Sequence, residues 1–319
     1  MNTPITEIGG YFGLESFSGT EYHENLIAVN TGRNALAYVL KARKIKKLYI
    51  PTFLCDCVER LCMREGCAYE KYSVGTDFMP RLSENPGAEE WVYVVNYYGQ
   101  VSDEVILAMQ KRWGRIIVDH VQDFFRKPLP GIDTIYSCRK FFGVADGAYL
   151  STDATLETEP DKSRHRMEHV LGRFETSASQ YFSIFQKNDE ALYDLPLRQM
   201  SRLTRNLLRA IDYEVVRRKR TENFSVLEEK LGSYNKLKIA KIPGAYCYPF
   251  LCDNGAEIRK RLVQQKIYIP TLWPNVTDDP AATELEKFMA QNILPLPCDQ
   301  RYGTEDMRHM AQAVMAALK

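Results

Sequence analysis

The sequence lacks the features that would point to a membrane, a nucleic acid or an exported protein. Over 319 residues, 42 Lys and Arg nearly balance 41 Asp and Glu, which leaves a formal charge of +1. This balance excludes a whole-protein electrostatic footprint for nucleic acid or anionic membrane. No apolar run approaches the roughly 20 residues of a membrane span. The N-terminus has no basic stretch followed by an apolar one, so we expect no signal peptide and a cytoplasmic protein.

The sequence contains few cysteines, and they form no paired metal-binding or redox motif. The eight cysteines form no CxxC pair, and without a secretion signal this usage predicts reduced thiols. Four of them cluster at Cys55, Cys57, Cys62 and Cys67. Their spacing fits no zinc knuckle, so we expect no metal there.

The first half of the chain alternates short β-rich runs with amphipathic segments. We expect strands at 46–51, 91–99, 115–120, 133–138 and 147–152, and helices at 33–43, 56–66 and 103–113. Buried strands separated by helices predict an α/β fold, in which a mostly parallel sheet is covered on both faces.

The second half follows a different pattern. We expect an irregular polar segment (153–195), one long helix (200–231), a strand (246–252), a helix (255–265), a strand (266–270) and a final helix (304–318). Gly232 is the predicted C-cap of the long helix. This order predicts a large domain over 1–235 that includes the long helix, and a small C-terminal α+β domain over 236–319.

Polar residues follow several of the expected strands. Because open parallel sheets bind ligands at the carboxyl ends of their strands, these residues are candidates for a site. The helix opened by Gly32, Arg33 and Asn34 offers free backbone N–H groups to a phosphate. Asp119 ends one strand, and Lys140 follows another. No Walker A or GxGxxG motif is present, so we expect neither a nucleoside triphosphate nor a dinucleotide there.

Taken singly, these residues have ordinary explanations. Asp119 could be a turn or capping residue, and Lys140 a surface lysine with a buried stem. Together with the phosphate cradle they fit pyridoxal phosphate chemistry. That chemistry needs a lysine that is nucleophilic as the free amine, because burial lowers its pKa. It also needs a carboxylate that keeps the pyridine nitrogen protonated.

The order of several motifs strengthens this interpretation. TGRNAL, IPTFLCDCV, VVNYYG, IIVDHVQDFF, YSCRKFFGVADGAYL and ILPLPCDQRY resemble the DegT/StrS sugar aminotransferases among the fold-type I pyridoxal phosphate enzymes. The resemblance covers about residues 28–318. It implies a three-layer large domain of the fold-type I kind, a smaller C-terminal domain, a homodimer and pyridoxal 5'-phosphate as cofactor.

The resemblance also implies roles by position. Lys140 would hold the cofactor covalently and move the α-proton, and Asp119 would pair with the pyridine nitrogen. Gln122 would lie near the 3-hydroxyl. Ser137 would bind the phosphate together with the backbone at Gly32, Arg33 and Asn34. Phe53 is the only aromatic in the segment that usually stacks on the ring, and Cys55 is the alternative there.

Three departures from the family pattern stand out. The first motif usually reads Ser-Gly-Thr, whereas Arg33 adds a charge beside the phosphate here. The spacing from Ser137 to Lys140 is shorter than in well-known members. The asparagine that the partner subunit usually contributes is missing before the long helix, where Arg198 or Gln199 are the candidate substitutes.

The resemblance implies an aminotransferase that moves an amino group from glutamate to a keto sugar. We expect a nucleotide-linked sugar and a role in surface polysaccharide or related sugar biosynthesis. The candidate residues at the substrate mouth are Tyr97, Tyr98, Arg301 and Tyr302, with packing between domains as an equal alternative. The expected partners are small molecules, with no nucleic acid and no membrane.

Two other functions compete with this one. His165, Glu168 and His169 match the H-x-x-E-H zinc-peptidase pattern, which on a helix would place both imidazoles on one face. The pattern is short and its surroundings are polar and basic. A non-catalytic descendant of the fold is the other alternative, but the presence of Lys140 and Asp119 argues against it.

The basic run 217–220 is a weaker signal. Glu214 and Glu222 flank it, so we interpret it as a solvated helix face rather than a nucleic-acid site.

Overall fold

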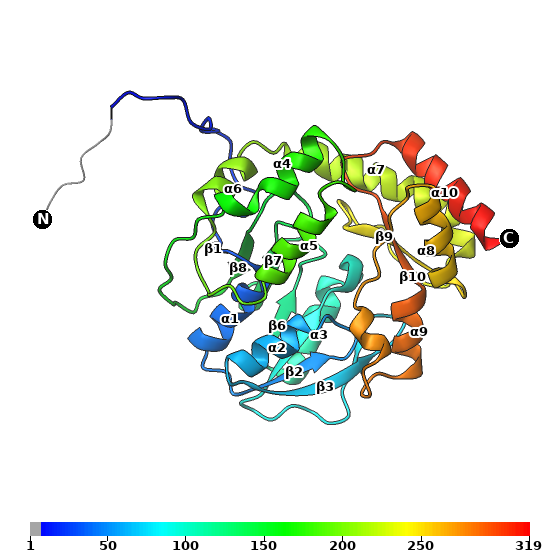
Figure 1. Cartoon of the computed structure of the whole chain (residues 1–319). Coiled ribbons are helices and arrows are strands. Elements are labelled where there is room, and N and C mark those ends of the chain that lie inside the picture. The colour runs from blue at the N-terminus through cyan, green and yellow to red at the C-terminus, as the bar shows by residue number, and fades with distance from the viewer. Residues whose placement is uncertain (1–7) are drawn as a thin grey trace, which may run out of the picture.

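The computed structural model describes residues 8–319. Residues 1–7 belong to the segment in which we expected no signal peptide, and they lie outside the described residues. The chain forms one eight-stranded sheet in the order β1-β8-β7-β6-β5-β2-β3-β4 and a two-stranded sheet of β10 and β9 (Figure 1). The strands are β1 (Ile27–Val29), β2 (Lys47–Pro51), β3 (Ala68–Val74), β4 (Pro80–Arg81), β5 (Trp91–Val95), β6 (Ile116–Asp119), β7 (Asp133–Ser137), β8 (Ala148–Ser151), β9 (Cys247–Leu251) and β10 (Ile293–Pro297).

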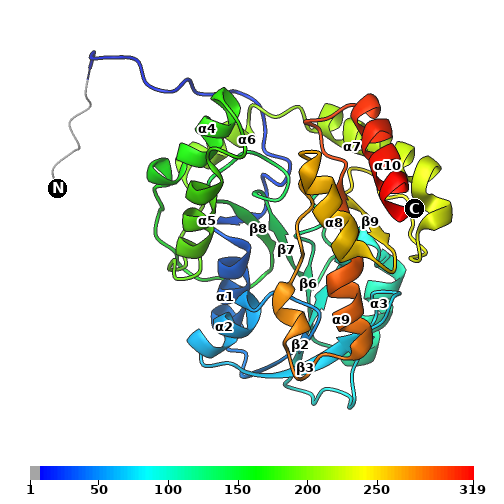
Figure 2. The same ribbon diagram turned by 45° about the vertical axis from the view of Figure 1, so that its right-hand side comes forward.

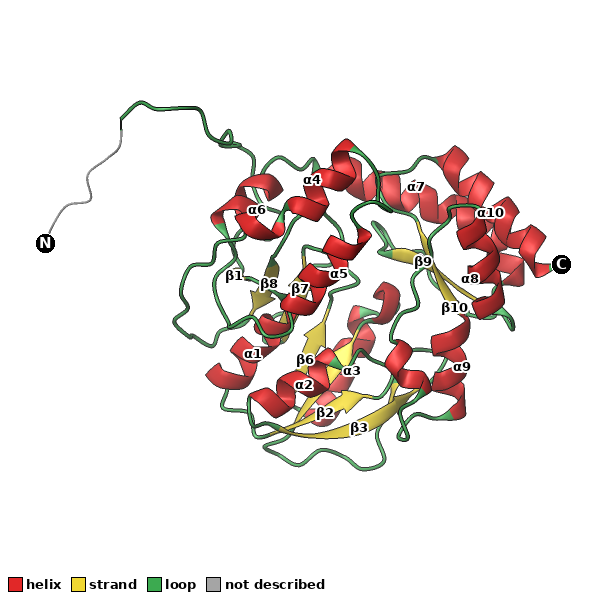
Figure 3. Cartoon of the chain, in the orientation of Figure 1, coloured by secondary structure: helices red, strands yellow, loops and turns green. Residues whose placement is uncertain are grey.

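Helices surround both sheets (Figure 3). They are α1 (Gly32–Ala42), α2 (Cys57–Arg64), α3 (Asp103–Trp113), α4 (Glu168–Glu175), α5 (Phe182–Ala191), α6 (Arg202–Leu208), α7 (Tyr213–Leu231), α8 (Gly255–Gln264), α9 (Glu284–Asn292) and α10 (Thr304–Leu318). The predicted α/β class and the five strands expected in the first half are confirmed.

The direction of the strands defines one edge of the large sheet at which a ligand is expected to bind. Strands β3, β2, β5, β6 and β7 run parallel. The chain moves from β2 to β3 in one direction along the sheet, and from β5 to β6 in the other. Because such crossovers are right-handed, α2 and α3 lie on opposite faces, as Figure 2 shows. Ligands bind where the strand order reverses, outside the carboxyl ends of these strands.

Strand β1 ends at the same edge. It pairs antiparallel with β8, and β8 pairs antiparallel with β7, so β1 runs in the direction of β7. Thr31 follows it and caps α1, since its hydroxyl accepts the backbone N–H of Asn34 at 3.1 Å. Helix α1 therefore starts at this edge of the sheet.

The predicted long helix is two helices. Helix α6 ends at Leu208, and Asp212 caps α7 by accepting the N–H of Val215 at 3.0 Å. Leu207, Leu208 and Ile211 continue the helical spacing across the break, so the periodicity gave no sign of it. Gly232 is the C-cap of α7, as the sequence predicted. Gly232 has a φ of −56° and opens a short 3-10 turn.

Helices α7, α8 and α10 enclose the small sheet and share one apolar core with it (Figure 1). Phe224, Leu227 and Leu231 of α7 contribute to this core. The strand predicted at 266–270 is wrong: no strand forms there, and Lys266 has a positive φ of 59°. The partner of β9 is β10 instead, paired antiparallel from Ile293 opposite Leu251.

The polar segment 153–195, expected to be irregular, contains α4 and α5 (Figure 3). Helix α5 has no buried residue, so it lacks the apolar stripe that sequence periodicity detects. Several large apolar side chains of these helices are exposed instead, namely Leu171, Phe174, Phe182 and Phe185.

Candidate active site at the carboxyl edge of the sheet

Asp119 is the last residue of β6, and its carboxylate is held by two donors. Its Oδ2 accepts the hydroxyl of Tyr93 at 2.6 Å, and its Oδ1 accepts the backbone N–H of Val121 at 2.8 Å. The residue is only 4% exposed. Burial raises the pKa of Asp119, while the charge of Lys140 and the two hydrogen bonds act in the opposite direction. The carboxylate is thus fixed in one orientation at the edge of the sheet.

Lys140 follows β7 by three residues and reaches solvent even though protein groups surround it. Burial lowers the pKa of its amine, and the charge of Asp119 opposes this. Its Nζ lies 5.7 Å from the ring centroid of Tyr246. Among residues 8–319, Lys140 forms no ion pair within 4.0 Å. Asp119 and Lys140 therefore interact electrostatically without forming an ion pair, and burial favours the uncharged form of the amine, which is the nucleophilic one.

Gln122 lies in the turn after β6, and the nitrogen of its side-chain amide is free. Its Oε1 accepts the N–H of Tyr98 at 2.8 Å, which joins the ends of β5 and β6. The residue is buried, yet within the described part of the chain its Nε2 has no acceptor. A buried donor without an acceptor costs about 1–3 kcal/mol. This amide therefore has a donor ready for a ligand.

The start of α1 lies against this turn. A Cβ placed on Gly32 would be 3.5 Å from Cγ1 of Val121. The N–H groups of Gly32 and Arg33 have no acceptor among the described residues, as expected for the first turn of a helix. They are suited to a phosphate. Asn34 has a different role, because its backbone N–H already bonds to Thr31. Ser137 lies half-buried at the end of β7.

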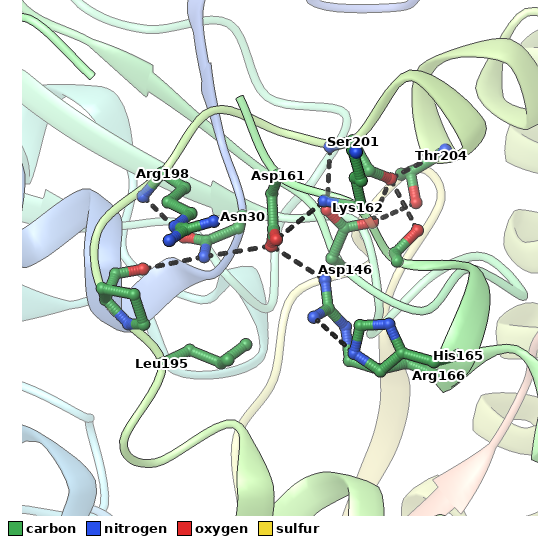
Figure 4. A network of polar contacts seen from close by, with 12 residues as sticks. Asn30, Asp146, Asp161, Lys162, His165, Arg166, Leu195, Arg198, Ser201 and Thr204 are labelled. Atoms are coloured by element: carbon green, nitrogen blue, oxygen red, sulfur yellow. Dashed lines mark hydrogen bonds and ion pairs between the residues drawn. The ribbon is translucent and has the colours of Figure 1, made fainter. Parts of the chain in front are cut away.

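A polar network surrounds Asn30, which lies between β1 and α1 (Figure 4). The Oδ1 of Asn30 accepts the side-chain N–H of Asn34 at 2.8 Å, and the Nδ2 of Asn30 donates to the carbonyl of Pro196 at 3.0 Å. Nearby, Arg166 and Asp161 form a buried ion pair at 2.8 Å. The segment between β8 and α6 is thus anchored to the residues that precede α1.

A second part of this network ties α6 to the loop before β8 (Figure 4). Asp146 accepts the hydroxyl of Ser201 at 2.8 Å and its backbone N–H at 2.9 Å. It also accepts the hydroxyl of Thr204. All three side chains are buried, so the network fixes the backbone at Asp146, in the loop that connects Lys140 to β8.

The H-x-x-E-H segment does not form the helix that a zinc site requires. His165 lies in a 3-10 turn, and α4 begins only at Glu168. The Nδ1 of His169 lies 2.9 Å from Nδ2 of Asn188. Over residues 8–319, no group of three His, Cys, Asp or Glu side chains could hold a metal ion. The structure therefore gives the zinc-peptidase alternative no support.

The aromatic candidates are core residues. Phe53, Tyr97 and Tyr98 are each 1% exposed. Phe53 packs against Tyr97 and Trp273 at centroid distances of 5.5 and 4.8 Å. Phe53 thus has no exposed face on which a cofactor ring could stack. The structure corrects the expected mouth role of Tyr97 and Tyr98 to the packing alternative.

The C-terminal candidates remain accessible. Arg301 is exposed, and its guanidinium donates two hydrogen bonds of 2.7 and 2.8 Å to the carboxylate of Asp299. Tyr302 is half-buried beside it.

The cysteine expectation needs one correction. Cys55 and Cys57 are joined in a disulfide with their Cα atoms 5.4 Å apart. The chain brings them together because one residue separates them at the turn into α2. The other six cysteines are free and buried.

Two functional residues escaped the sequence analysis. Tyr93 lies in the run WVYVV, which appears purely apolar. Arg220 was placed on a solvated basic face, yet it is 1% exposed. It shares the spacing of Phe224, Leu227 and Leu231, which is the signal that could have revealed its burial.

Arg220 ties the segment that carries Lys140 to the small sheet. Its guanidinium donates to the carbonyls of Ala245 at 2.9 Å and Phe141 at 3.2 Å, and to Oε1 of Gln300 at 2.8 Å. Phe141 directly follows Lys140, and Ala245 directly precedes Tyr246. The lysine and the ring near it are therefore held by one buried side chain.

Comparison with known proteins finds similarity in fold but no match at the level of family profiles or curated sequences. No protein-family profile and no curated protein matches the sequence. Many solved structures match the fold. A DegT/DnrJ/EryC1/StrS aminotransferase from Brucella abortus has a TM-score of 0.63 at 14% identity, over 91% of this chain and 85% of that one. NtdA from Bacillus subtilis, solved with the cofactor PMP, has a TM-score of 0.67 at 15% identity, over 95% and 78%.

The sugar aminotransferase CalS13 from Micromonospora echinospora has a TM-score of 0.64 at 14% identity, over 92% of this chain and 87% of that one. The chain has the fold of these aminotransferases. The predicted architecture is thereby confirmed over nearly the whole chain.

Proposed function

We propose that the chain is a pyridoxal phosphate-dependent aminotransferase. The observation that carries the proposal is the meeting of three groups at one edge of the sheet. These are the buried carboxylate of Asp119, the amine of Lys140 with its lowered pKa, and the free N–H groups at the start of α1. Perturbed titratable groups at the carboxyl edge of a parallel sheet are typical of catalytic sites. The fold shared with aminotransferases supports the same conclusion.

The residues present fit the cofactor. Gln122 has a buried Nε2 without an acceptor, which suits the 3-hydroxyl. The N–H groups of Gly32 and Arg33 suit the phosphate, with Ser137 as an additional donor. When bound, pyridoxal phosphate supplies a ring that accepts electrons from the substrate carbon.

Each residue then has a defined task. Lys140, as the free amine, takes the proton from the α-carbon of the amino donor and returns a proton on the other side of the transfer. Asp119 holds a proton on the ring nitrogen, and Tyr93 and Val121 fix the orientation of its carboxylate. Arg220 bonds to the residues next to Lys140 and Tyr246 and so fixes the position of these two side chains relative to each other.

We further propose glutamate as amino donor, and a nucleotide-linked keto sugar as acceptor, in surface polysaccharide or related sugar biosynthesis. We expect a cytoplasmic homodimer. The exposed apolar side chains Leu171 and Phe174 of α4 and Phe182 and Phe185 of α5 support self-association. No helix of the described chain is long and apolar enough to cross a membrane.

The test follows the cofactor spectrum. Protein loaded with pyridoxamine phosphate is mixed with nucleotide-linked keto sugars, and with simple 2-oxo acids for comparison. Return of the pyridoxal spectrum with a keto sugar, and its reversal by glutamate, are the expected results. Lys140→Ala is the matched control and should give no return. Absence of any change with every carbonyl compound and with glutamate would refute amino-group transfer.

A further inference from the structure

A pocket of about 540 Å³ lies beside the candidate active site, between α1, α2 and the end of α5. Its volume is in the roughly 300–1,000 Å³ range of small-molecule sites. Three arginines line it, Arg33, Arg60 and Arg64, together with Tyr193. Such a concentration of guanidinium groups around one aromatic ring needs an explanation.

The guanidinium of Arg33 lacks a direct anionic partner. Its guanidinium lies 4.1 Å from the ring centroid of Tyr193, and its buried Nη1 has no acceptor within the described chain. It forms no ion pair there either. Burial lowers the pKa of Arg33, and the nearby charges of Arg139 and Arg64 act in the same direction, against Asp189 and Tyr193. A partly buried cation without a partner is costly, unless a ligand brings the missing negative charge.

The other two arginines complete the frame. Arg64 is occupied, since it donates to Oδ1 of Asn34 at 3.1 Å and to the carbonyl of Tyr193 at 3.4 Å. Arg60 lies on the exposed side, 5.1 Å from the Tyr193 centroid, and pairs with Asp56 at 2.7 Å. Arg33 is therefore the arginine with a free donor inside the pocket. Arg64 forms part of the pocket wall, and Arg60 lies at its exposed rim.

The carboxylates that line the pocket oppose a bound anion only weakly. Glu190 and Asp194 line the pocket but are exposed. Solvent and salt therefore screen their repulsion, and their oxygens can accept hydroxyl groups. A phosphate at Arg33 with hydroxyls toward these carboxylates matches the polarity of the pocket.

This site is separate from the phosphate cradle of α1. The cradle uses backbone N–H groups at the helix start, which lies beside Val121. The side chain of Arg33 instead extends to Tyr193 at the end of α5. We propose that the pocket binds a phosphate or diphosphate group of the acceptor substrate, and that Arg33 is its principal ligand. This proposal rests on the proposed function and assigns the anionic end of its substrate.

Calorimetric titration with inorganic pyrophosphate tests the pocket, on the protein with and without bound pyridoxal phosphate. Arg33→Gln should weaken pyrophosphate binding about 10- to 100-fold, which corresponds to the ~1.5–3 kcal/mol of one charge-assisted hydrogen-bond set. Arg33→Lys should fall between, because it keeps the charge but loses the planar fork. Arg112→Gln, at the exposed end of α3, is the control and should bind like wild type.

The affinity for pyridoxal phosphate, measured on the same variants, separates the two sources of phosphate. It should stay within about twofold of wild type in Arg33→Gln. A tenfold loss of cofactor affinity, with pyrophosphate competing for the cofactor, would overturn the proposal in favour of the cofactor's own phosphate. Equal pyrophosphate binding by wild type and Arg33→Gln would also overturn it. If pyrophosphate binding depends on Arg33 while no variant takes up the cofactor, the anion site stands and the proposed function fails.

Discussion

Tyr93→Phe isolates one hydrogen bond of the candidate site without changing the shape of the core. The phenol is buried, 3% exposed, and donates to Oδ2 of Asp119 at 2.6 Å. Burial holds the pKa of Tyr93 well above its usual value, so the donor keeps its proton at every working pH. Losing this bond costs about 1.5–3 kcal/mol when the carboxylate is ionised, and about 0.5–1.5 kcal/mol when it is protonated.

The loss therefore depends on pH. Burial raises the pKa of Asp119 above its ordinary value near ~3.9. The carboxyl therefore ionises at lower pH in the unfolded chain than in the folded protein. The free energy of unfolding falls as pH rises from the ordinary value to the folded-state pKa. Tyr93→Phe raises that pKa further, by about one unit for each 1.4 kcal/mol lost. The variant should be destabilised by about 1 kcal/mol at the acidic end of the Asp119 titration, where the carboxyl is protonated, and by about 2 kcal/mol at the alkaline end, where it is ionised.

Urea unfolding of the cofactor-free protein at the two pH values measures this difference. In the Asp119→Asn background the carboxylate is gone, so Tyr93→Phe should cost the same at both. An equal loss at the acidic and alkaline ends in the otherwise wild-type protein would refute an ionisable Asp119 held by Tyr93. With cofactor bound, kcat of the variant should fall by a larger factor than its KM changes.

Three further outcomes are expected. Arg220→Met leaves buried carbonyls without donors and should lower the free energy of unfolding by about 3 kcal/mol. Arg218 has an exposed side chain that pairs with Glu222 at 3.2 Å, so Arg218→Gln should lose under about 1 kcal/mol. Equal losses for the two variants in urea titrations would contradict the buried role of Arg220. Thiol titration of the unfolded, unreduced protein should find the six free cysteines, rising to eight after reduction. Asp119→Asn should still take up the cofactor yet lose most turnover, and full turnover would disprove its role at the ring nitrogen.

Local patterns predicted the layers of the fold because apolar runs of period two or 3.6 carry most of that information. They located β2, β5, β6, β7 and β8 correctly, since these strands are buried. They missed β3, where AYEKYSV mixes polar and apolar residues at a less buried position. They also missed α4 and α5, whose apolar side chains are exposed.

The sequence also indicated which residues would meet at the edge of the sheet. The structure brings Gly32, Asp119, Gln122 and Lys140 to it, because their strands run in one direction. Side-chain environment was harder to infer. Whether an aromatic such as Phe53 faces a ligand or the core depends on residues distant in sequence, here Trp273.

Reduction with borohydride and peptide mapping test the central claim most directly. Protein incubated with pyridoxal phosphate should turn yellow, and borohydride should fix the cofactor on the peptide that contains Lys140. Lys140→Ala should remain unlabelled at that peptide. A wild-type protein that takes up no cofactor, or carries it on another lysine while Lys140 stays unmodified, would contradict the account.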